Sequence, residues 1–342
     1  MSQYILLKDI KVENANAIQG ITYGFPSPTN FLGYTHALSR ALQQQFGSVA
    51  CLGGVGIVCH EHQVLAQRIG YETVFALTRN PITHEGKTAP FNEEGRMHMR
   101  VSLLIECEFD ILSLELGDGT PEQREKLFCD LLRNKAVSQR LAGGTITQIG
   151  LVKALTFNPA NADYEREFRR WMLRLIPGFV LQDRHDALQA HHQQRLEQNN
   201  KAELLDSWLD FIALDSHATL ADDFEGEAVE GESSALWQIK PKPEVGYFVP
   251  LAIGFTSISE LYSPGEVARA RDNSVPFGFV ESIYSLAQWV GPHRIKTPED
   301  MLWHYHYQQD EHKNTDYLCR NKKRMTNTAL AEQDLNDFDD DY

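Results

Sequence analysis

The chain has 342 residues, 42% of them hydrophobic and 10% aromatic, with a formal net charge of −15. This length suits one large domain or two ordinary ones, and no run of 18 apolar residues predicts a membrane helix. Lys8 and Asp9 interrupt the first apolar run, so we expect no signal peptide.

The first half of the chain predicts alternating strands and helices. A strand is expected over Tyr4–Val12, and the prolines of Gly24–Asn30 predict a turn. A helix should follow over Phe31–Phe46, where Leu38 and Leu42 fall on one face. Further strands are expected at Gly53–His60, Thr73–Thr78, Met97–Phe109 and Leu141–Thr147, and a second helix at Pro121–Val137.

The pattern turns helical after residue 162. Tyr164–Ile176 has one apolar face at i, i+3, i+4 and i+7, and Gln182–Leu214 predicts one or two more helices. Strands are expected again at Trp237 and Tyr247–Ile253. The last elements are interpreted as helices over Pro264–Arg271, Phe279–Val290 and Pro298–Tyr307.

This order predicts an α+β fold with a ferredoxin-like, RRM-like core that a mainly helical region interrupts. We place the core in residues 1–150 and 236–312, with C-terminal helices, and the helical insertion in residues 151–221. Residues 222–235 are expected to form an acidic flexible linker, and residues 313–342 a flexible tail, basic and then acidic.

The negative charge is concentrated in two segments. Residues 222–232 contain six acids and no base, and the last twelve residues contain six more. Without these twelve acids the net charge of −15 becomes about −3. A charge of −15 argues against a polyanionic partner, but a nearly neutral body can carry local basic surfaces.

Sequence motifs give little support to catalysis or metal binding. There is no Gly-x-Ser-x-Gly elbow, and the five cysteines, none at Cys-x-x-Cys spacing, are interpreted as buried thiols in a reducing, cytoplasmic compartment. His60 and His62 would share one face of a strand, which a metal could use, but no second ligand cluster completes a site. Gly53-Gly54 and Gly143-Gly144 are interpreted as bulges or tight turns. We therefore expect no catalytic residue, no metal and no cofactor.

Basic side chains indicate nucleic-acid binding instead. Arg166, Arg170 and Arg174 recur every four residues opposite an apolar face, a pattern that fits either a phosphate-binding helix or a solvated one. The run Arg320–Arg324 is interpreted as a loose tail. Single arginines at expected turns could hold an RNA strand: Arg79, Arg96, Arg140, Arg269 and Arg271. No Lys/Arg-Gly-Phe-x-Phe run indicates the aromatic platform of an RNA-recognition sheet.

Several stretches together resemble one family, the second Csy protein, which is the Cas-five-type subunit of type I-F CRISPR surveillance complexes. They run in order from about residue 5 to 306: Glu13–Ala17, Gly24–Thr29, Gly33–Arg40, Gly54–His60, Leu77–Pro81, Glu93–Arg96, Val101–Leu104, Arg140–Gly144, Arg174–Phe179, Tyr262–Val267, Ala270–Asp272, Phe279–Glu281, Pro292–Arg294 and Leu302–His306. The acidic 222–232 block and the tail past about residue 310 fall outside the resemblance.

The resemblance implies a ferredoxin-like palm with a thumb-like insertion and a role without catalysis. Such a subunit caps the 5′ handle of the CRISPR RNA, pairs with the large subunit and abuts the backbone subunit. Target DNA is then reached indirectly, through guide pairing, and no membrane is involved. We expect that some of the donors inside matching motifs hold the handle: His36, Arg40, Arg79, Arg96, Arg140, Arg269, Arg271, His293 and Arg294.

Polar residues at turns could also contact RNA, and two other functions are possible for the chain. Asn14, Asn16 and Ser27 lie in turn motifs and could donate to RNA or cap the fold. One alternative is a ferredoxin-like, metal-independent CRISPR RNA endoribonuclease with His36, His60 or His98 as general base. The other is a purely structural adaptor whose arginines face the acids of a protein partner.

Overall fold

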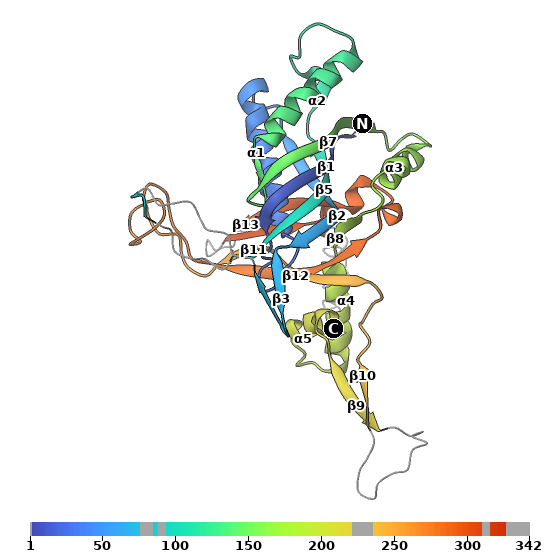
Figure 1. Ribbon diagram of the computed structural model, residues 1–342, viewed down its shortest axis with the longest axis vertical. Coiled ribbons are helices and arrows are strands. Elements are labelled where there is room, and N and C mark those ends of the chain that lie inside the picture. Colours follow the sequence, from blue (N-terminus) through green and yellow to red (C-terminus); the bar gives the residue numbers. More distant parts are fainter. Residues whose placement is uncertain (1, 76–84, 88–93, 221–234, 310–314, 326–342) are drawn as a thin grey trace, which may run out of the picture.

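The computed structural model describes residues 2–75, 85–87, 94–220, 235–309 and 315–325 (Figure 1). Within these ranges the main sheet has ten strands in the order β13-β14-β11-β12-β8-β2-β5-β1-β7-β6. All its pairings are antiparallel. Helices pack against this sheet, which confirms the predicted α+β class.

One half of the sheet is built by the first six long elements of the chain. They are β1 (Ser2–Asn16), α1 (Pro28–Phe46), β2 (Leu52–Val64), β5 (Arg96–Cys107), α2 (Pro121–Val137) and β7 (Gly144–Phe157). Their strands lie in the order β2-β5-β1-β7. The predicted strands at the first, second and fourth positions and both predicted helices are confirmed, because each has a long apolar run or a clear apolar face.

The first part of β1 is buried on both faces of the sheet. Ile5 and Leu7 of β1 point into the core beneath α1 and α2, whereas Tyr4 and Leu6 point into a second core beneath α3 (Tyr164–Leu173). A strand covered on both sides needs apolar residues at every position, which explains the continuous run Tyr4–Leu7. In α3 the buried residues Phe168 and Met172 form the face that sequence periodicity predicted.

The other half of the sheet closes on itself through β2. It contains β8 (Phe179–Asp183), β11 (Tyr247–Ser257), β12 (Val280–Val290), β13 (Leu302–Gln309) and β14 (Thr315–Arg320). Because β13 pairs with β2 as well as with β14, the strands β2, β8, β12, β11, β14 and β13 form a closed circuit of pairings. The indole of Trp303 lies inside this circuit and donates to the carbonyl oxygen of Leu181 over 2.9 Å.

Three predicted helices near the C-terminus are wrong. The segment expected at Phe279–Val290 is the strand β12, and Pro298–Tyr307 contains a short 3-10 turn, η3 (Pro298–Asp300), and most of β13. Residues 264–271 lie in the loop between β11 and β12 without forming a helix. In β12 the four consecutive residues 285–288 are all buried, so no alternation marks the strand, and short apolar runs of this kind fit either type of element.

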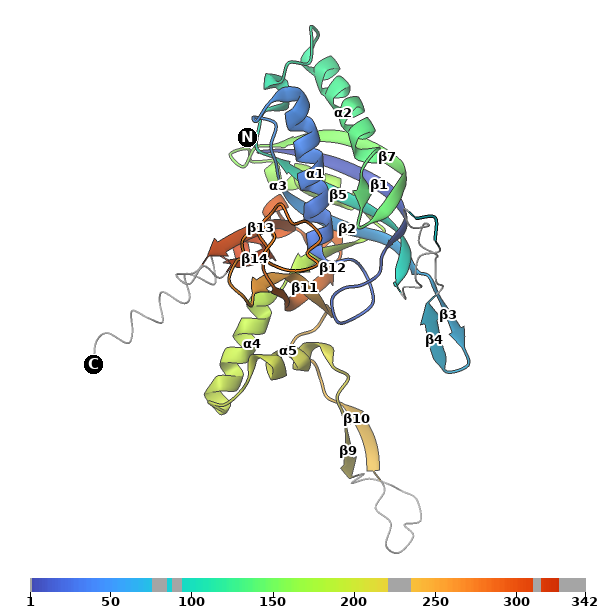
Figure 2. The same ribbon diagram turned by 90° about the vertical axis from the view of Figure 1, so that its left-hand side faces the viewer.

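Segment 151–221 combines helices with strands of the main sheet. It contains the end of β7, all of β8, and the helices α3, α4 (His185–Gln198) and α5 (Leu204–Ile212). Two separate ribbons project from the body in Figure 2, β3–β4 (Ala66–Ile69, Glu72–Phe75) and β9–β10 (Ser216–Leu220, Ala235–Ile239). The remaining pieces are β6 (Arg140–Leu141), η1 (Ile111–Ser113) and η2 (Pro292–Arg294).

Some predictions lie outside the described residues or stay predictions. Arg79, the acidic block 222–232 and the chain after residue 325 are among the undescribed parts, and of the expected strand Thr73–Thr78 only the part to Phe75 is described. The domain boundaries stay a prediction. Across the described part of the chain, no helix combines the length and the apolar character needed to span a membrane.

Candidate nucleic-acid interface

Four predicted donors lie where β1 ends and β5 and β6 begin. Asn16 lies opposite Arg96 in the β1–β5 register, and its backbone N–H donates to the carbonyl oxygen of Ala142 over 2.8 Å. Arg140 donates to the carbonyl oxygen of Gly143 over 3.3 Å. Asn14 lies two residues before Asn16, so the strand-end group consists of Asn14, Asn16, Arg96 and Arg140.

A tight turn holds the strand-end group together. Ala142 and Gly143 both have positive φ, as the short hairpin between β6 and β7 requires, so the turn predicted at Gly143-Gly144 is confirmed. A side chain at Gly144 would begin 2.7 Å from the backbone oxygen of Glu13, so only glycine allows β7 to approach β1 here. Asn14 also has a positive φ, at a bulge of β1, where asparagine is well tolerated.

Two of the predicted donors have partners inside the fold. The amide of Asn16 both donates to and accepts from the backbone of Ile18, at 3.2 and 3.1 Å. Ser27 is buried at the start of α1, with its hydroxyl 2.5 Å from that of Thr29. These side chains therefore shape their turns, and whether they also contact RNA stays a prediction.

A second group of cations lies on α1 and in the β11–β12 loop. His36 and Arg40 are one helical turn apart on the exposed face of α1, opposite the buried Leu38 and Leu42. Arg269 and Arg271 are exposed in the loop 258–279. Figures 1 and 2 show this loop on the side of the molecule that α1 also faces.

The third group combines α3 with η2. Arg166 and Arg170 are exposed on α3, and Arg174 is exposed at its C-cap. The turn η2 packs against this helix, with His293 and Arg294 exposed as well. The guanidinium of Arg174 stacks on Trp171 at 4.4 Å from the ring centroid. Arg166 lies 3.9 Å from Asp163, a long and exposed ion pair.

Ion pairs distinguish the arginines that stabilise the fold from those whose guanidinium groups are available to bind phosphate. Arg100, Arg184, Arg195 and Arg320 each contact a carboxylate, and Arg96 pairs with Glu94. In the ranges that the structure describes, several of the predicted RNA-binding arginines have no carboxylate within ion-pair distance: Arg40, Arg140, Arg170, Arg174, Arg269, Arg271 and Arg294. These side chains can bind phosphate without first breaking an ion pair.

The expectation that His60 and His62 share one face is wrong. A register shift between Cys59 and Glu61 places a bulge at His60. His62 consequently lies near Cys59, with Sγ and Nδ1 3.9 Å apart, whereas His60 contacts Ser102 and Pro177. No group of three or more His, Cys, Asp or Glu side chains within the described ranges is arranged to hold a metal ion.

Both ring nitrogens of His60 are engaged. Its Nδ1 donates to the carbonyl oxygen of Pro177 over 2.7 Å, and its Nε2 accepts from the hydroxyl of Ser102 over 2.6 Å. That hydroxyl oxygen in turn accepts from the backbone N–H of Asp9 over 3.0 Å. Burial lowers the pKa of His60, so the neutral form that completes this chain is favoured.

The Gly53-Gly54 pair makes room for a histidine. Glu106 accepts from the backbone N–H of Gly54 over 3.2 Å and from His304 Nε2 over 2.8 Å. A side chain at Gly54 would begin 2.4 Å from the His304 ring. A register shift between Leu52 and Val55 confirms the predicted bulge at the glycines. The hydrogen bond from His304 lowers the pKa of Glu106.

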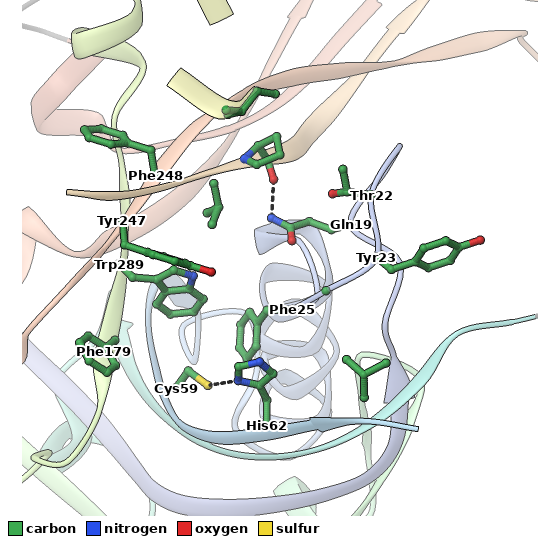
Figure 3. A pocket seen from close by; sticks show the side chains of 15 residues that line it. Gln19, Thr22, Tyr23, Phe25, Cys59, His62, Phe179, Tyr247, Phe248 and Trp289 are labelled. Carbon is green, nitrogen blue, oxygen red and sulfur yellow. Dashed lines mark hydrogen bonds between the residues drawn. The ribbon is translucent and has the colours of Figure 1, made fainter. Parts of the chain in front are cut away.

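A cavity of about 810 Å³ opens beside the end of β2 (Figure 3). Tyr23, Phe179 and Tyr247 at its rim are more than half exposed, and Phe25 and Trp289 form part of its wall. Gln19 donates to the carbonyl oxygen of Pro250 over 2.5 Å. No lysine or arginine is among its described lining residues, so the cavity suits an apolar side chain or a flat ring better than a phosphate.

Sequence patterns missed an aromatic surface built by three strands. Phe255 of β11, Tyr317 of β14 and Tyr307 of β13 lie opposite one another in register, and Tyr305 lies two residues before Tyr307. We call these four residues the aromatic platform. The predicted helix over Pro298–Tyr307 concealed the alternation of Trp303, Tyr305 and Tyr307, which was the available signal.

Comparison with known proteins identifies the family. A family model described as "CRISPR-associated protein (Cas_Csy2)" matches residues 5–319. The CRISPR-associated protein Csy2 of Pseudomonas aeruginosa (strain UCBPP-PA14) is 35% identical over 322 residues, which cover 90% of this chain and 92% of that protein. The chain is thus similar to CRISPR-associated proteins over nearly its whole length. It belongs to the Csy2 family of type I-F CRISPR systems, as the sequence motifs indicated.

Proposed function

We propose that this chain is a non-catalytic, cytoplasmic subunit of a type I-F CRISPR RNA-guided surveillance complex. It caps the 5′ handle of the CRISPR RNA, pairs with the large subunit next to the backbone subunits, and reaches target DNA only through the guide in antiviral defence. The observation that carries the proposal is the set of exposed arginines without carboxylate partners, on a described surface of a Csy2-family chain whose net charge is −15.

The order of elements supports a ferredoxin-like palm as the scaffold. The sequence β1-α1-β2-β5-α2-β7 is a β-α-β-β-α-β unit, and its four strands are antiparallel neighbours. In this proposal the helices α3 to α5 and the adjoining ribbon correspond to the inserted, thumb-like region. The strand-end group and α3 then present cations on two sides of the palm.

The histidines support a role without catalysis. A metal-independent ribonuclease needs an accessible histidine with a proton donor beside it. His60 has both nitrogens engaged, and His98 Nδ1 accepts from the backbone N–H of Asn14 over 3.3 Å. His36 is exposed near Tyr305, with ring centroids 6.4 Å apart. Of these three histidines it is therefore the candidate for a general base. Site-specific cuts in handle RNA incubated with the protein and EDTA, lost in His36→Ala, would replace this proposal with the ribonuclease.

The cavity beside β2 supports a protein partner in addition to RNA. Exposed aromatic rings around an opening without described cations can receive an apolar side chain of the large subunit. Such a contact would cover Tyr23, Phe179 and Tyr247, which are otherwise left in water.

Cross-linking tests the RNA contact directly. The chain co-expressed with its large subunit and a guide containing 4-thiouridine should form cross-links from the handle, mapped by mass spectrometry to peptides with the unpaired arginines. Cross-links confined to the large subunit would instead support the purely structural adaptor.

A further inference from the structure

We propose that the aromatic platform, Phe255, Tyr305, Tyr307 and Tyr317, is a stacking surface for unpaired bases of single-stranded RNA. This inference rests on the proposed function and adds to it the place and the chemistry of base recognition. No single aromatic run in the sequence indicates such a surface, because its rings come from the paired strands β13 and β14 and from β11, which lies about 50 residues earlier in the chain.

Three rings of the platform, those of Phe255, Tyr317 and Tyr305, are arranged in parallel. Phe255 and Tyr317 have centroids 5.4 Å apart and planes 13° apart, and Tyr317 and Tyr305 have centroids 6.1 Å apart and planes 11° apart. The His36 ring continues this series from α1, 6.4 Å from Tyr305 and tilted by 38°. Aligned rings supported by neighbouring strands offer a rigid surface, which lowers the entropy lost when a base stacks on it.

The platform is open to solvent beside a covered part of the same sheet face. Trp303 and Cys319, on the same face as Tyr305, are buried in the core that α1 covers. Tyr305 and Tyr307 are 55% and 64% exposed. Large aromatic rings that stay in water while the adjacent positions are buried mark a binding surface.

The charges next to the platform match a nucleic acid. Arg40 follows His36 by one turn on the exposed face of α1, and the loop that carries Arg269 and Arg271 leaves β11 shortly after Phe255. These three arginines have no carboxylate within ion-pair distance among the described residues. Acids of the loop are partly engaged locally, since Asp272 accepts from Ser274 and Glu266 from Ser263. Parallel rings, with unpaired arginines on the elements that adjoin them, form the combination that binds bases and phosphates of one strand.

The test compares RNA that has bases with RNA that lacks them. The probes are a fluorescein-labelled oligouridine and an abasic oligoribonucleotide of equal length, titrated against the chain co-purified with its large subunit. The double variant Tyr305→Ala/Tyr307→Ala should lose about 10-fold or more in affinity for oligouridine for each base that no longer stacks. It should bind the abasic RNA as the unchanged protein does. Tyr305→Phe/Tyr307→Phe keeps the rings and should stay close to the unchanged protein.

Tyr71→Ala is the matched control, because Tyr71 is fully exposed in the turn between β3 and β4. Equal oligouridine affinity of the alanine double variant and the unchanged protein would overturn the platform. If Arg170→Ala/Arg174→Ala still weakened binding in that case, the proposed function would stand without the platform. Absence of RNA binding by the unchanged complex would overturn both. If the alanine double variant no longer co-purified with the large subunit but kept its RNA affinity, the tyrosines would contact protein instead.

Discussion

The Nε of Arg320 lies 2.9 Å from Oδ2 of Asp183, and both side chains are buried. This ion pair joins β14, close to the end of the described chain, to β8 in its middle. The same carboxylate accepts from the backbone N–H groups of Asn321 and His185, at 3.0 Å each. The run Arg320–Arg324, expected to be part of a loose tail, is thus anchored at its start, and Lys323 and Arg324 pair with Asp300 and Asp186.

Replacing Asp183 should strongly destabilise the protein. Asp183→Ala leaves the buried Arg320 guanidinium and two N–H groups without their acceptor, which costs about 3–5 kcal/mol. Urea unfolding monitored by circular dichroism measures the change. Glu244→Ala is the control, because Glu244 pairs with Arg184 at the surface and should cost under about 1 kcal/mol. Equal, small losses in both variants would show that the buried pair does not anchor β14.

Acid should destabilise the fold through His185. Burial, with a smaller contribution from the nearby Arg320, lowers the pKa of His185 to about 4, against the opposing effects of Asp183 and Asp186. The unfolded chain takes up this proton near pH 6.5, so stability is full above that pH and falls by up to roughly 3 kcal/mol as the pH drops toward 4. Unfolding free energies of the unchanged protein and His185→Gln across this range should show a shallower slope for the variant, and identical slopes would exclude His185 as the source.

Two glycine substitutions should have opposite effects on stability. Gly54→Ala introduces a methyl group 2.4 Å from the His304 ring and should cost about 1–3 kcal/mol. Gly33→Ala in α1 meets no atom within 4 Å and should gain roughly 0.5–1 kcal/mol, because alanine favours the helix. Thermal melts report both changes, and a neutral Gly54→Ala would mean that β2 and β13 do not approach as closely as described.

The arginines of α3 should bind RNA through phosphate. Arg170→Ala/Arg174→Ala should weaken RNA binding by similar factors for different sequences, and should lower the slope of log affinity against log salt by about 1 for each lost contact. Fluorescence anisotropy at four salt concentrations measures both quantities. Lys126→Ala, an exposed cation on α2, is the control. Unchanged slopes in the double variant would assign these arginines to a protein contact.

Long periodic segments of the fold could be predicted from the sequence, and contacts between distant segments could not. The predicted helix Pro121–Val137 has the same bounds as α2, whose Thr120–Gln123 capping box is visible in the sequence. The strand β12 was predicted as a helix, because burial on both faces removes the alternation that identifies a strand. Its pairing with β11 and β8, which the sequence does not reveal, makes this segment a strand.

The candidate site shows the same division. Arg166, Arg170 and Arg174 could be grouped by helical spacing, and α3 does expose them together. The platform also needs Phe255 of β11 to become a neighbour of Tyr317 in β14 through strand register, which no local pattern encodes. The bulge at His60 likewise follows from pairing between β2 and β5, so the separation of His60 from His62 could not be predicted.

Binding of guide RNA with and without its 5′ handle tests the central claim most directly. The chain, purified with its large subunit, is titrated with an intact guide and with a guide of equal length whose handle is replaced by unrelated sequence. We predict that the intact guide binds at least about 10-fold more tightly, and that this difference disappears when the unpaired arginines are substituted. Equal affinity for both guides would contradict a handle-capping function.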